Sequence, residues 1–335
     1  WLEPYRQQLI SRDEYITRKT DEIIGSQDVR KFSLGHLYFG LHRTADGWIF
    51  REWAPNAIAI YFICDATDWQ DRLDFAMDRT TDESAWELKI PADKLHHLDH
   101  YKLHVYWAGG NGERIPSYAT YVVQDPKTNI FDAVVWAPNT EYTWQSKAPQ
   151  RPDEQLIYEA HIGMSGDREA VSTYRQFETE VLPRIKDLGY NTVQLMAIQE
   201  HPYYGSFGYQ VSNFYAESSR FGTPDDLKHL IDTAHQMELR VIMDVVHSHS
   251  VKNENEGLGN FAGDCCQYFK PELHSAWDSR LFDYGKPQVM HFLLSNLHFW
   301  QDEYHFDGFR FDGVTSMIYH NHGLGQAFTS YDDYF

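Results

Sequence analysis

The chain has 335 residues, enough for two domains. Hydrophobic residues make up 42% and aromatic residues 16% of it, which supports large packed cores and excludes a disordered protein. A net charge of −20 would repel nucleic acid and anionic membranes, so neither is expected as a partner, whereas a neutral polyhydroxylated ligand is compatible with it.

Residues 1–24 are predicted to form an amphipathic helix that ends at Gly25, because apolar residues recur among charged ones at helical spacing. The chain then divides into a β-rich domain over residues 25–140 and a β/α domain over residues 141–335. A polar, proline-marked connector at 137–152 joins them.

Short strands are predicted in the β-rich domain at 47–53, 57–63, 85–90 and 101–107. Turn signals separate them at 45–47, 54–56 and 109–112. Regularly spaced short strands are typical of an antiparallel β-sandwich.

Strands and helices alternate after the connector. We expect strands at 156–163, 192–198, 240–246 and 308–314, and helices at 173–188, 224–238 and 287–303. Thr223 is the predicted N-cap of the second of these helices. Repeated β/α units predict a parallel sheet, here the first half of a (β/α)8 barrel. Half a barrel leaves open sheet edges, so we expect a fragment of a longer protein. A closed eight-stranded barrel within residues 150–335 would contradict this expectation.

The stretch Gly308-Phe309-Arg310-Phe311-Asp312-Gly313-Val314 places two charges in an apolar strand. Side chains alternate along a strand, so Arg310 and Asp312 share one face and are expected to be a buried pair. In a barrel this pair would point inward at the catalytic end of the strand. A structural ion pair remains the alternative.

No metal or cofactor is expected. His247 and His249, or His320 and His322, have H-x-H spacing, but no cysteine or carboxylate cluster accompanies them at ligand spacing. The three cysteines are Cys64, Cys265 and Cys266; the adjacent pair is poorly placed for an ordinary disulfide and is expected to be unreactive. An odd, low cysteine count favours a reducing compartment.

Several motifs together resemble the α-amylase superfamily, glycoside hydrolase family 13. Asp244-Val245-Val246-His247-Ser248-His249 resembles its first signature region, and Gly308-Phe309-Arg310-Phe311-Asp312 its second. The longer stretches 308–323, 197–210 and 277–282 resemble the glycogen and starch branching-enzyme family within it. Residues 51–55 and Asp68-Trp69 resemble the carbohydrate-binding module of family 48.

The resemblance implies a role for each matching residue. Asp312 would be the catalytic nucleophile, and Arg310 beside it would keep it ionised. Asp244 and His249 would bind the hydroxyls of the reacting sugar, and Tyr209 would stack beneath its ring. A platform of Trp53 and Pro55 would bind glycan on the sandwich, although a tryptophan in a sandwich is as readily a core residue.

The implied activity is transfer of an α-1,4-glucan to a 6-hydroxyl with retention, which makes α-1,6 branches in glycogen, amylose or amylopectin. The implied location is the cytoplasm, or a plastid.

The family's acid/base Glu follows a fifth strand and its stabilising Asp a seventh, so we expect the 335 residues alone to be inactive. Glu159 and Glu200 are expected to have structural roles. An isoamylase-type debranching enzyme and a non-catalytic glycan-binding protein are the alternatives. Oligomeric state is left open.

Overall fold

The computed structural model describes residues 2–81, 84–325, 327 and 329–330. Its helices are α1 Arg6–Ile24, α2 Val29–Phe32, α3 Tyr174–Gln176, α4 Leu182–Asp187, α5 Pro224–Gln236, α6 Pro287–Tyr304 and α7 Val314–Ile318. Its strands are β1 Gly40–Thr44, β2 Gly47–Glu52, β3 Ala57–Cys64, β4 Asp78–Arg79, β5 Trp86–Pro91, β6 His100–Trp107, β7 Gly110–Arg114, β8 Val122–Gln124, β9 Phe131–Val134, β10 Ile157–Ala160, β11 Thr192–Leu195, β12 Gln199–Glu200, β13 Asn213–Glu217, β14 Arg240–Val245, β15 Phe269–His274, β16 Ser279–Phe282 and β17 Gly308–Phe311.

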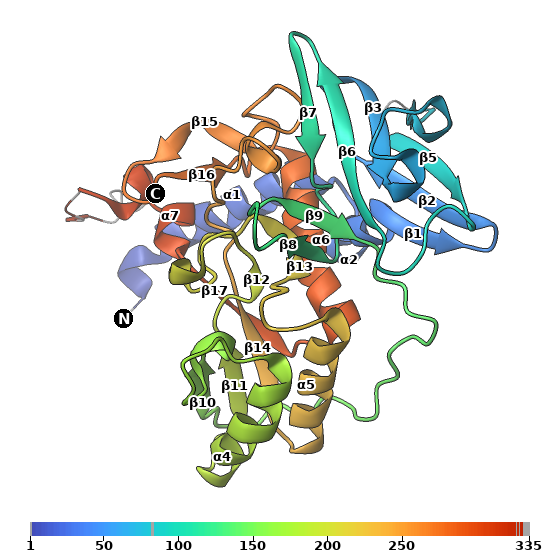
Figure 1. Ribbon diagram of the computed structural model, residues 1–335. Coiled ribbons are helices and arrows are strands. Elements are labelled where there is room, and N and C mark those ends of the chain that lie inside the picture. Colours follow the sequence, from blue (N-terminus) through green and yellow to red (C-terminus); the bar gives the residue numbers. More distant parts are fainter. Residues whose placement is uncertain (1, 82–83, 326, 328, 331–335) are drawn as a thin grey trace.

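The first nine strands form an antiparallel sandwich, as predicted (Figure 1). One sheet has the order β1-β2-β5-β4 and the other β3-β6-β9-β8, with β7 added on β6. Their inner faces meet through aromatic rings such as Phe50 and Phe62, 5.4 Å apart. The turn predicted at 109–112 is wrong, because Gly110 already pairs with Trp107 and begins β7. The turn is confined to Ala108 and Gly109.

The second part is a parallel sheet with the order β10-β11-β14-β17, as the β/α alternation predicted. Helix α5 begins at the predicted cap: Thr223 Oγ1 accepts from the Asp226 N–H, and Asp226 Oδ2 accepts from the Thr223 N–H. The helix predicted at 173–188 is interrupted by a π-helical turn at Phe177–Val181. Pro183 follows directly and has no N–H to continue the regular bonding.

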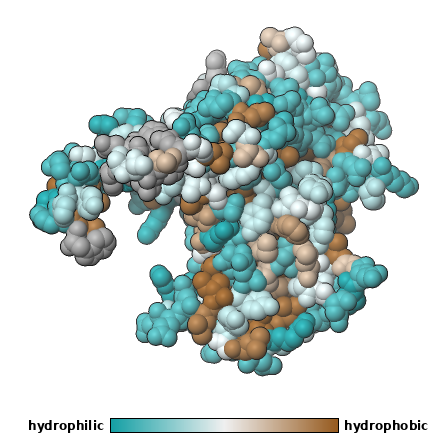
Figure 2. Space-filling model, turned by 90° about the vertical axis from the view of Figure 1, so that its left-hand side faces the viewer, coloured by the Kyte–Doolittle hydropathy of each residue, from teal (hydrophilic) through white to brown (hydrophobic). Residues whose placement is uncertain are grey.

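Both edges of this parallel sheet are open in the described part of the chain, so the sheet is the half barrel that was predicted. Beside the β10 edge, the side chains of Leu156, Ile157, Met164 and Leu188 are exposed. Figure 2 shows apolar surface in its lower half, on the side of the molecule where Figure 1 places β10 and α4.

Helix α1 lies where it was predicted, but its apolar residues do not pack. Leu9, Tyr15 and Ile16 are exposed, and Ile24 alone in the helix is buried. The expected amphipathic face is therefore solvent-exposed. Within the described ranges, none of the helices combines the length and hydropathy needed to cross a membrane.

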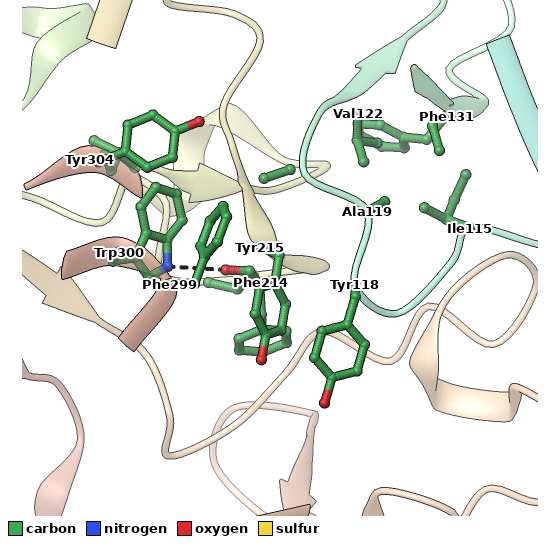
Figure 3. Close-up of a cluster of buried hydrophobic side chains, with 14 of the residues drawn as sticks. Ile115, Tyr118, Ala119, Val122, Phe131, Phe214, Tyr215, Phe299, Trp300 and Tyr304 are labelled. Carbon is green, nitrogen blue, oxygen red and sulfur yellow. Dashed lines mark hydrogen bonds between the residues drawn. The ribbon is translucent and has the colours of Figure 1, made fainter. Parts of the chain in front are cut away.

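The sandwich and the parallel domain share one continuous core. Tyr118, in the loop after β7, packs on Tyr215 of β13 with ring centroids 4.5 Å apart and on Phe292 of α6 at 5.3 Å. Figure 3 shows Tyr118 and Tyr215 between residues of the two domains. The segment before β1 also contacts α6, since the Gly35 N–H donates to Ser295 Oγ at 2.8 Å. The parallel domain is therefore packed against the sandwich through β13 and α6.

Candidate active site

Asp312 follows β17 directly and lies at the C-terminal end of the parallel sheet. Its N–H donates to the Val245 carbonyl at 3.0 Å, which fixes its position. The next residue, Gly313, has φ +65°, and a Cβ there would lie 2.5 Å from Ser248 Oγ, so a glycine is needed to turn the chain.

Arg310 and Asp312 form the expected ion pair, with Nη1 and Oδ1 2.8 Å apart. The expectation that the pair is buried is wrong. The Arg310 side chain is 44% exposed and that of Asp312 is 25% exposed. The physical reason is that β17 is an open edge of the sheet, and the strand ends at Phe311 instead of continuing to Val314.

Asp244 is the fully buried centre of the site. It is the cross-strand neighbour of Arg310, whose Nη1 lies 3.2 Å from Asp244 Oδ2. The Tyr209 hydroxyl donates to the same oxygen at 2.7 Å. Burial raises the pKa of Asp244 to about 6, while the Tyr209 hydrogen bond and the Arg310 charge act in the opposite direction.

His249 supports Tyr209. Its Nε2 lies 2.8 Å from the Tyr209 carbonyl oxygen, which can only accept, so Nε2 carries the proton. Nδ1 is then free to accept from the Ser248 hydroxyl at 2.9 Å. Burial lowers the pKa of His249, which favours this neutral form. The structure thus brings Arg310, Asp312, Asp244, Tyr209 and His249 into one connected group.

Gln194 is a member of this group that the sequence analysis missed. Its amide nitrogen donates to Asp244 Oδ1 at 2.8 Å and to Glu159 Oε1 at 3.2 Å. A polar residue inside the apolar stretch Thr192-Val193-Gln194-Leu195 was the available signal. Glu159 is exposed on the edge strand β10; it accepts a hydrogen bond from Gln194, and its charge helps to raise the pKa of Asp244.

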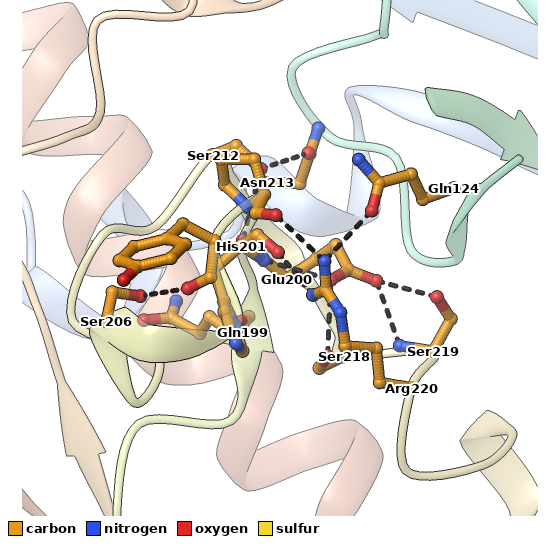
Figure 4. A network of polar contacts seen from close by, with 12 residues as sticks. Gln124, Gln199, Glu200, His201, Ser206, Ser212, Asn213, Ser218, Ser219 and Arg220 are labelled. Carbon is orange, nitrogen blue, oxygen red and sulfur yellow. Dashed lines mark hydrogen bonds and ion pairs between the residues drawn. The ribbon is translucent and has the colours of Figure 1, made fainter. Parts of the chain in front are cut away.

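Glu200 has the structural role that was expected (Figure 4). It is fully buried and accepts hydrogen bonds from the His201 and Ser219 N–H groups, from the Ser218 and Ser219 hydroxyls and from Arg220 Nη1. Arg220 Nη2 also donates to Gln124 Oε1 of β8 at 2.9 Å. The Glu200 network therefore ties the loop after β11 to the sandwich.

Trp53 and Pro55, the expected glycan platform, differ in their surroundings. Trp53 is partly buried, its ring 5.0 Å from that of Tyr268 and edge-on to it, and its carbonyl accepts from Gln267 Nε2. It faces the loop that precedes β15, whereas Pro55 is exposed. Their role as a glycan platform stays a prediction.

A second polar and aromatic face, which the sequence analysis missed, lies on the outer side of the sandwich. His104 bonds Asp71 Oδ1 at 2.8 Å through Nδ1 and Asn111 Oδ1 at 2.9 Å through Nε2. The Tyr106 hydroxyl donates to Asp71, and the Tyr61 ring lies 6.0 Å from that of Tyr106. The outward positions of β6 were the available signal. Such a face offers rings and hydroxyl partners to a sugar.

The histidine pairs do not form a metal site in the described residues. His247 is buried, and its Nε2 bonds Asn296 Oδ1 at 2.9 Å, away from the group around His249. The side chain of His320 lies outside the part of the structure that is described. The cluster that does have ligand geometry is Asp264, Cys265 and Cys266.

Comparison with known families and proteins agrees with this architecture. Residues 38–127 match carbohydrate-binding module 48, the isoamylase N-terminal domain, and residues 178–257 match the α-amylase catalytic domain. The chain is 47% identical over 347 residues to a 1,4-α-glucan-branching enzyme of Dictyostelium discoideum and 46% identical over 349 residues to one of Yarrowia lipolytica. Each alignment covers 100% of this chain and 50% of the relative.

Solved structures confirm the fold. The pullulanase of Paenibacillus barengoltzii complexed with maltotetraose superimposes with a TM-score of 0.70 at 21% identity, over 89% of this chain and 53% of that one. The type I pullulanase of Bacillus subtilis complexed with maltose gives a TM-score of 0.68 at 22% identity, over 83% and 43%.

The chain belongs to the α-amylase superfamily and combines a family 48 carbohydrate-binding module with part of the catalytic barrel. Its sequence relatives within that superfamily are 1,4-α-glucan-branching enzymes, and it spans about half of their length.

Proposed function

We propose that this chain supplies the glycan-binding module and the nucleophile of a 1,4-α-glucan branching enzyme. The observation that carries the proposal is the group Arg310, Asp312, Asp244 and Tyr209, which meets at the C-terminal ends of neighbouring parallel strands. Barrel enzymes carry their active sites at this end.

The chemistry follows from a carboxylate that retains accessible oxygen atoms. Asp312 would attack the anomeric carbon of an α-1,4 link and hold the glucan as a covalent ester. The 6-hydroxyl of an acceptor chain would then displace Asp312, and two inversions give net retention. Asp244 is fully buried and bonded by Tyr209 and Gln194, so its direct contact with sugar hydroxyls stays a prediction.

Retaining enzymes also need an acid/base carboxyl about 5–5.5 Å from the nucleophile. Glu200 is wholly engaged in its own network, and Glu159 is bonded to Gln194 on β10, at the opposite edge of the sheet from β17 and Asp312. We therefore infer that the 335 residues are inactive alone. A branching assay on this chain tests the inference, and turnover above background would contradict it.

A hydrolase of α-1,6 links is a second candidate, since the module match is to the isoamylase N-terminal domain. A chimera distinguishes the two. Residues 1–335 would replace the matching half of the Dictyostelium relative, and amylose and a branched glucan would be tested as substrates in parallel. Branching changes the iodine colour with little release of reducing ends, whereas debranching of a branched glucan releases them.

The glucan is proposed to bind the sandwich as well as the barrel. The Asp71, His104 and Tyr106 face and the Trp53 and Pro55 region are the two candidate surfaces. Affinity electrophoresis of the His104→Ala and Trp53→Ala variants in gels that contain glycogen distinguishes the two surfaces. A loss of retardation assigns the surface whose residue was changed.

We propose a cytoplasmic location, because free cysteines and no disulfide among the described residues suit a reducing compartment. A plastid is the alternative, since the Arabidopsis thaliana relative is a chloroplastic/amyloplastic enzyme. Microscopy of a fluorescent fusion of the full-length gene product distinguishes these locations.

A further inference from the structure

A cluster of metal-binding side chains that the sugar site does not use lies in the loop between β14 and β15. Asp264, Cys265 and Cys266 place one carboxylate oxygen and two sulfur atoms within 4.8 Å of one another. The two Sγ atoms are 3.2 Å apart. All three residues are partly exposed, so solutes can reach them.

The cluster is held in place from both domains. The Cys266 N–H donates to Asp264 Oδ1 at 2.7 Å, and Asn56 of the sandwich donates to Asp264 Oδ2 at 3.1 Å. Lys286, just before α6, donates to the Cys266 carbonyl. The next residue, Gln267, donates to the Trp53 carbonyl at 2.7 Å. The thiols are thus fixed at the junction between the sandwich and the barrel.

The positions of Cys265 and Cys266 suit a disulfide less well than a shared metal ion. Adjacent Cα atoms are about 3.8 Å apart, below the usual disulfide range of about 4.4–6.8 Å. Two thiolates about 2.3 Å from a tetrahedral zinc ion lie about 3.8 Å apart. The observed 3.2 Å between the sulfur atoms is closer to this spacing than to a bond of about 2.05 Å.

We propose that Cys265, Cys266 and Asp264 bind a soft divalent cation such as Zn²⁺ or Cd²⁺. Two S–H bonds break, two sulfur–metal bonds form, and two protons pass to the buffer, while Asp264 supplies an oxygen and water the fourth position. The proposal is independent of the branching activity.

The state of the thiols before binding agrees with this proton release. Burial, the hydrogen bond with Cys265 and the nearby Asp264 charge raise the pKa of Cys266 to about 11, so the metal has to displace its proton. The raised pKa also fits the expectation that Cys266 is a poor nucleophile.

Titration of the 335-residue chain with Cd²⁺ under a thiol-free reductant tests the proposal. We expect one ion per chain, thiolate-to-cadmium charge-transfer absorbance in the ultraviolet, and about two protons released per ion by calorimetry in buffers of different ionisation enthalpy. Cys265→Ser and Cys266→Ser should each weaken binding at least about tenfold, because loss of even an outer-shell partner costs that much. Cys64→Ala, which removes the buried third cysteine, should leave the affinity unchanged.

A second measurement needs no variant. Saturating Cd²⁺ should protect Cys265 and Cys266 from alkylation, read by mass spectrometry of the wild-type peptide. The proposal is overturned if both serine variants bind Cd²⁺ as tightly as the wild type, or if Cd²⁺ leaves alkylation of the two thiols unchanged.

Discussion

Glu200 and Asp312 both follow strands of the parallel sheet, yet their surroundings differ. Glu200 is fully buried and receives five hydrogen bonds that tie the loop after β11 together. The Asp312 side chain is a quarter exposed and pairs with Arg310. The first carboxylate has its oxygen atoms satisfied by the protein, and the second keeps capacity for a substrate. Satisfaction of the oxygens, more than position at a strand end, distinguishes the structural acid from the candidate nucleophile.

The largest effect is expected at the nucleophile. In the chimera with the Dictyostelium relative, Asp312→Asn should lower the branching rate at least about 10⁴-fold, since the amide cannot form the ester. Thermal unfolding should change little, because the side chain is partly exposed. A variant that kept more than a tenth of the rate would remove Asp312 from the mechanism. A large loss of stability would instead show that its role is structural.

Breaking the network of the buried Glu200 should lower stability. Arg220→Ala removes the cation 3.3 Å from Glu200 Oε1 and should lower the free energy of unfolding by about 3 kcal/mol, because a buried charge is left unpaired. Arg72→Ala, which breaks an exposed pair with Asp74, is the matched control. Urea unfolding measures both. Equal, small effects for the two variants would show that the Glu200 network contributes little.

Another buried carboxylate, Glu52, should make the stability pH-dependent. Burial raises its pKa from 4.5 to about 7, although Ser117 and the Trp53 N–H bond it. Because the folded value is the higher one, its contribution is fully present below pH 4.5 and is lost as the pH rises through 7. The loss is up to about 3 kcal/mol, at about 1.4 kcal/mol per pKa unit.

Urea unfolding at pH 4.5 and pH 7.5 measures this slope. Glu52→Gln, which cannot titrate, should make the change in unfolding free energy between the two pH values smaller by about that amount. An identical change in the wild type and the variant would show that Glu52 does not titrate in this range.

The smallest effect is expected at Tyr209. Tyr209→Phe removes the hydroxyl that donates to Asp244 and should lower kcat/KM of the chimera about tenfold, the value of one hydrogen bond to a charged group. That hydrogen bond lowers the pKa of Asp244, so its loss should raise the pKa further above about 6. The acidic limb of the pH–rate profile should therefore move to higher pH. If the acidic limb did not move, the group whose titration it reports would not be Asp244.

The sequence predicted the fold where local patterns decide it. Alternating apolar residues and turn signals indicated the sandwich, and the Thr223 cap marked the start of α5. It did not predict the exposure of Arg310, because exposure depends on which strands flank β17. It also missed Gln194, whose role is defined only when β11 and β14 pair. The Asp71 and His104 face required contacts between distant loops.

The measurement that tests the central claim most directly is covalent labelling of the nucleophile. The chimera would be trapped with a fluorinated α-maltosyl fluoride, digested and analysed by mass spectrometry. The account predicts a glycosyl ester on Asp312 and no label in Asp312→Asn. A label on Glu159, Glu200 or Asp244, with Asp312 unmodified, would contradict it.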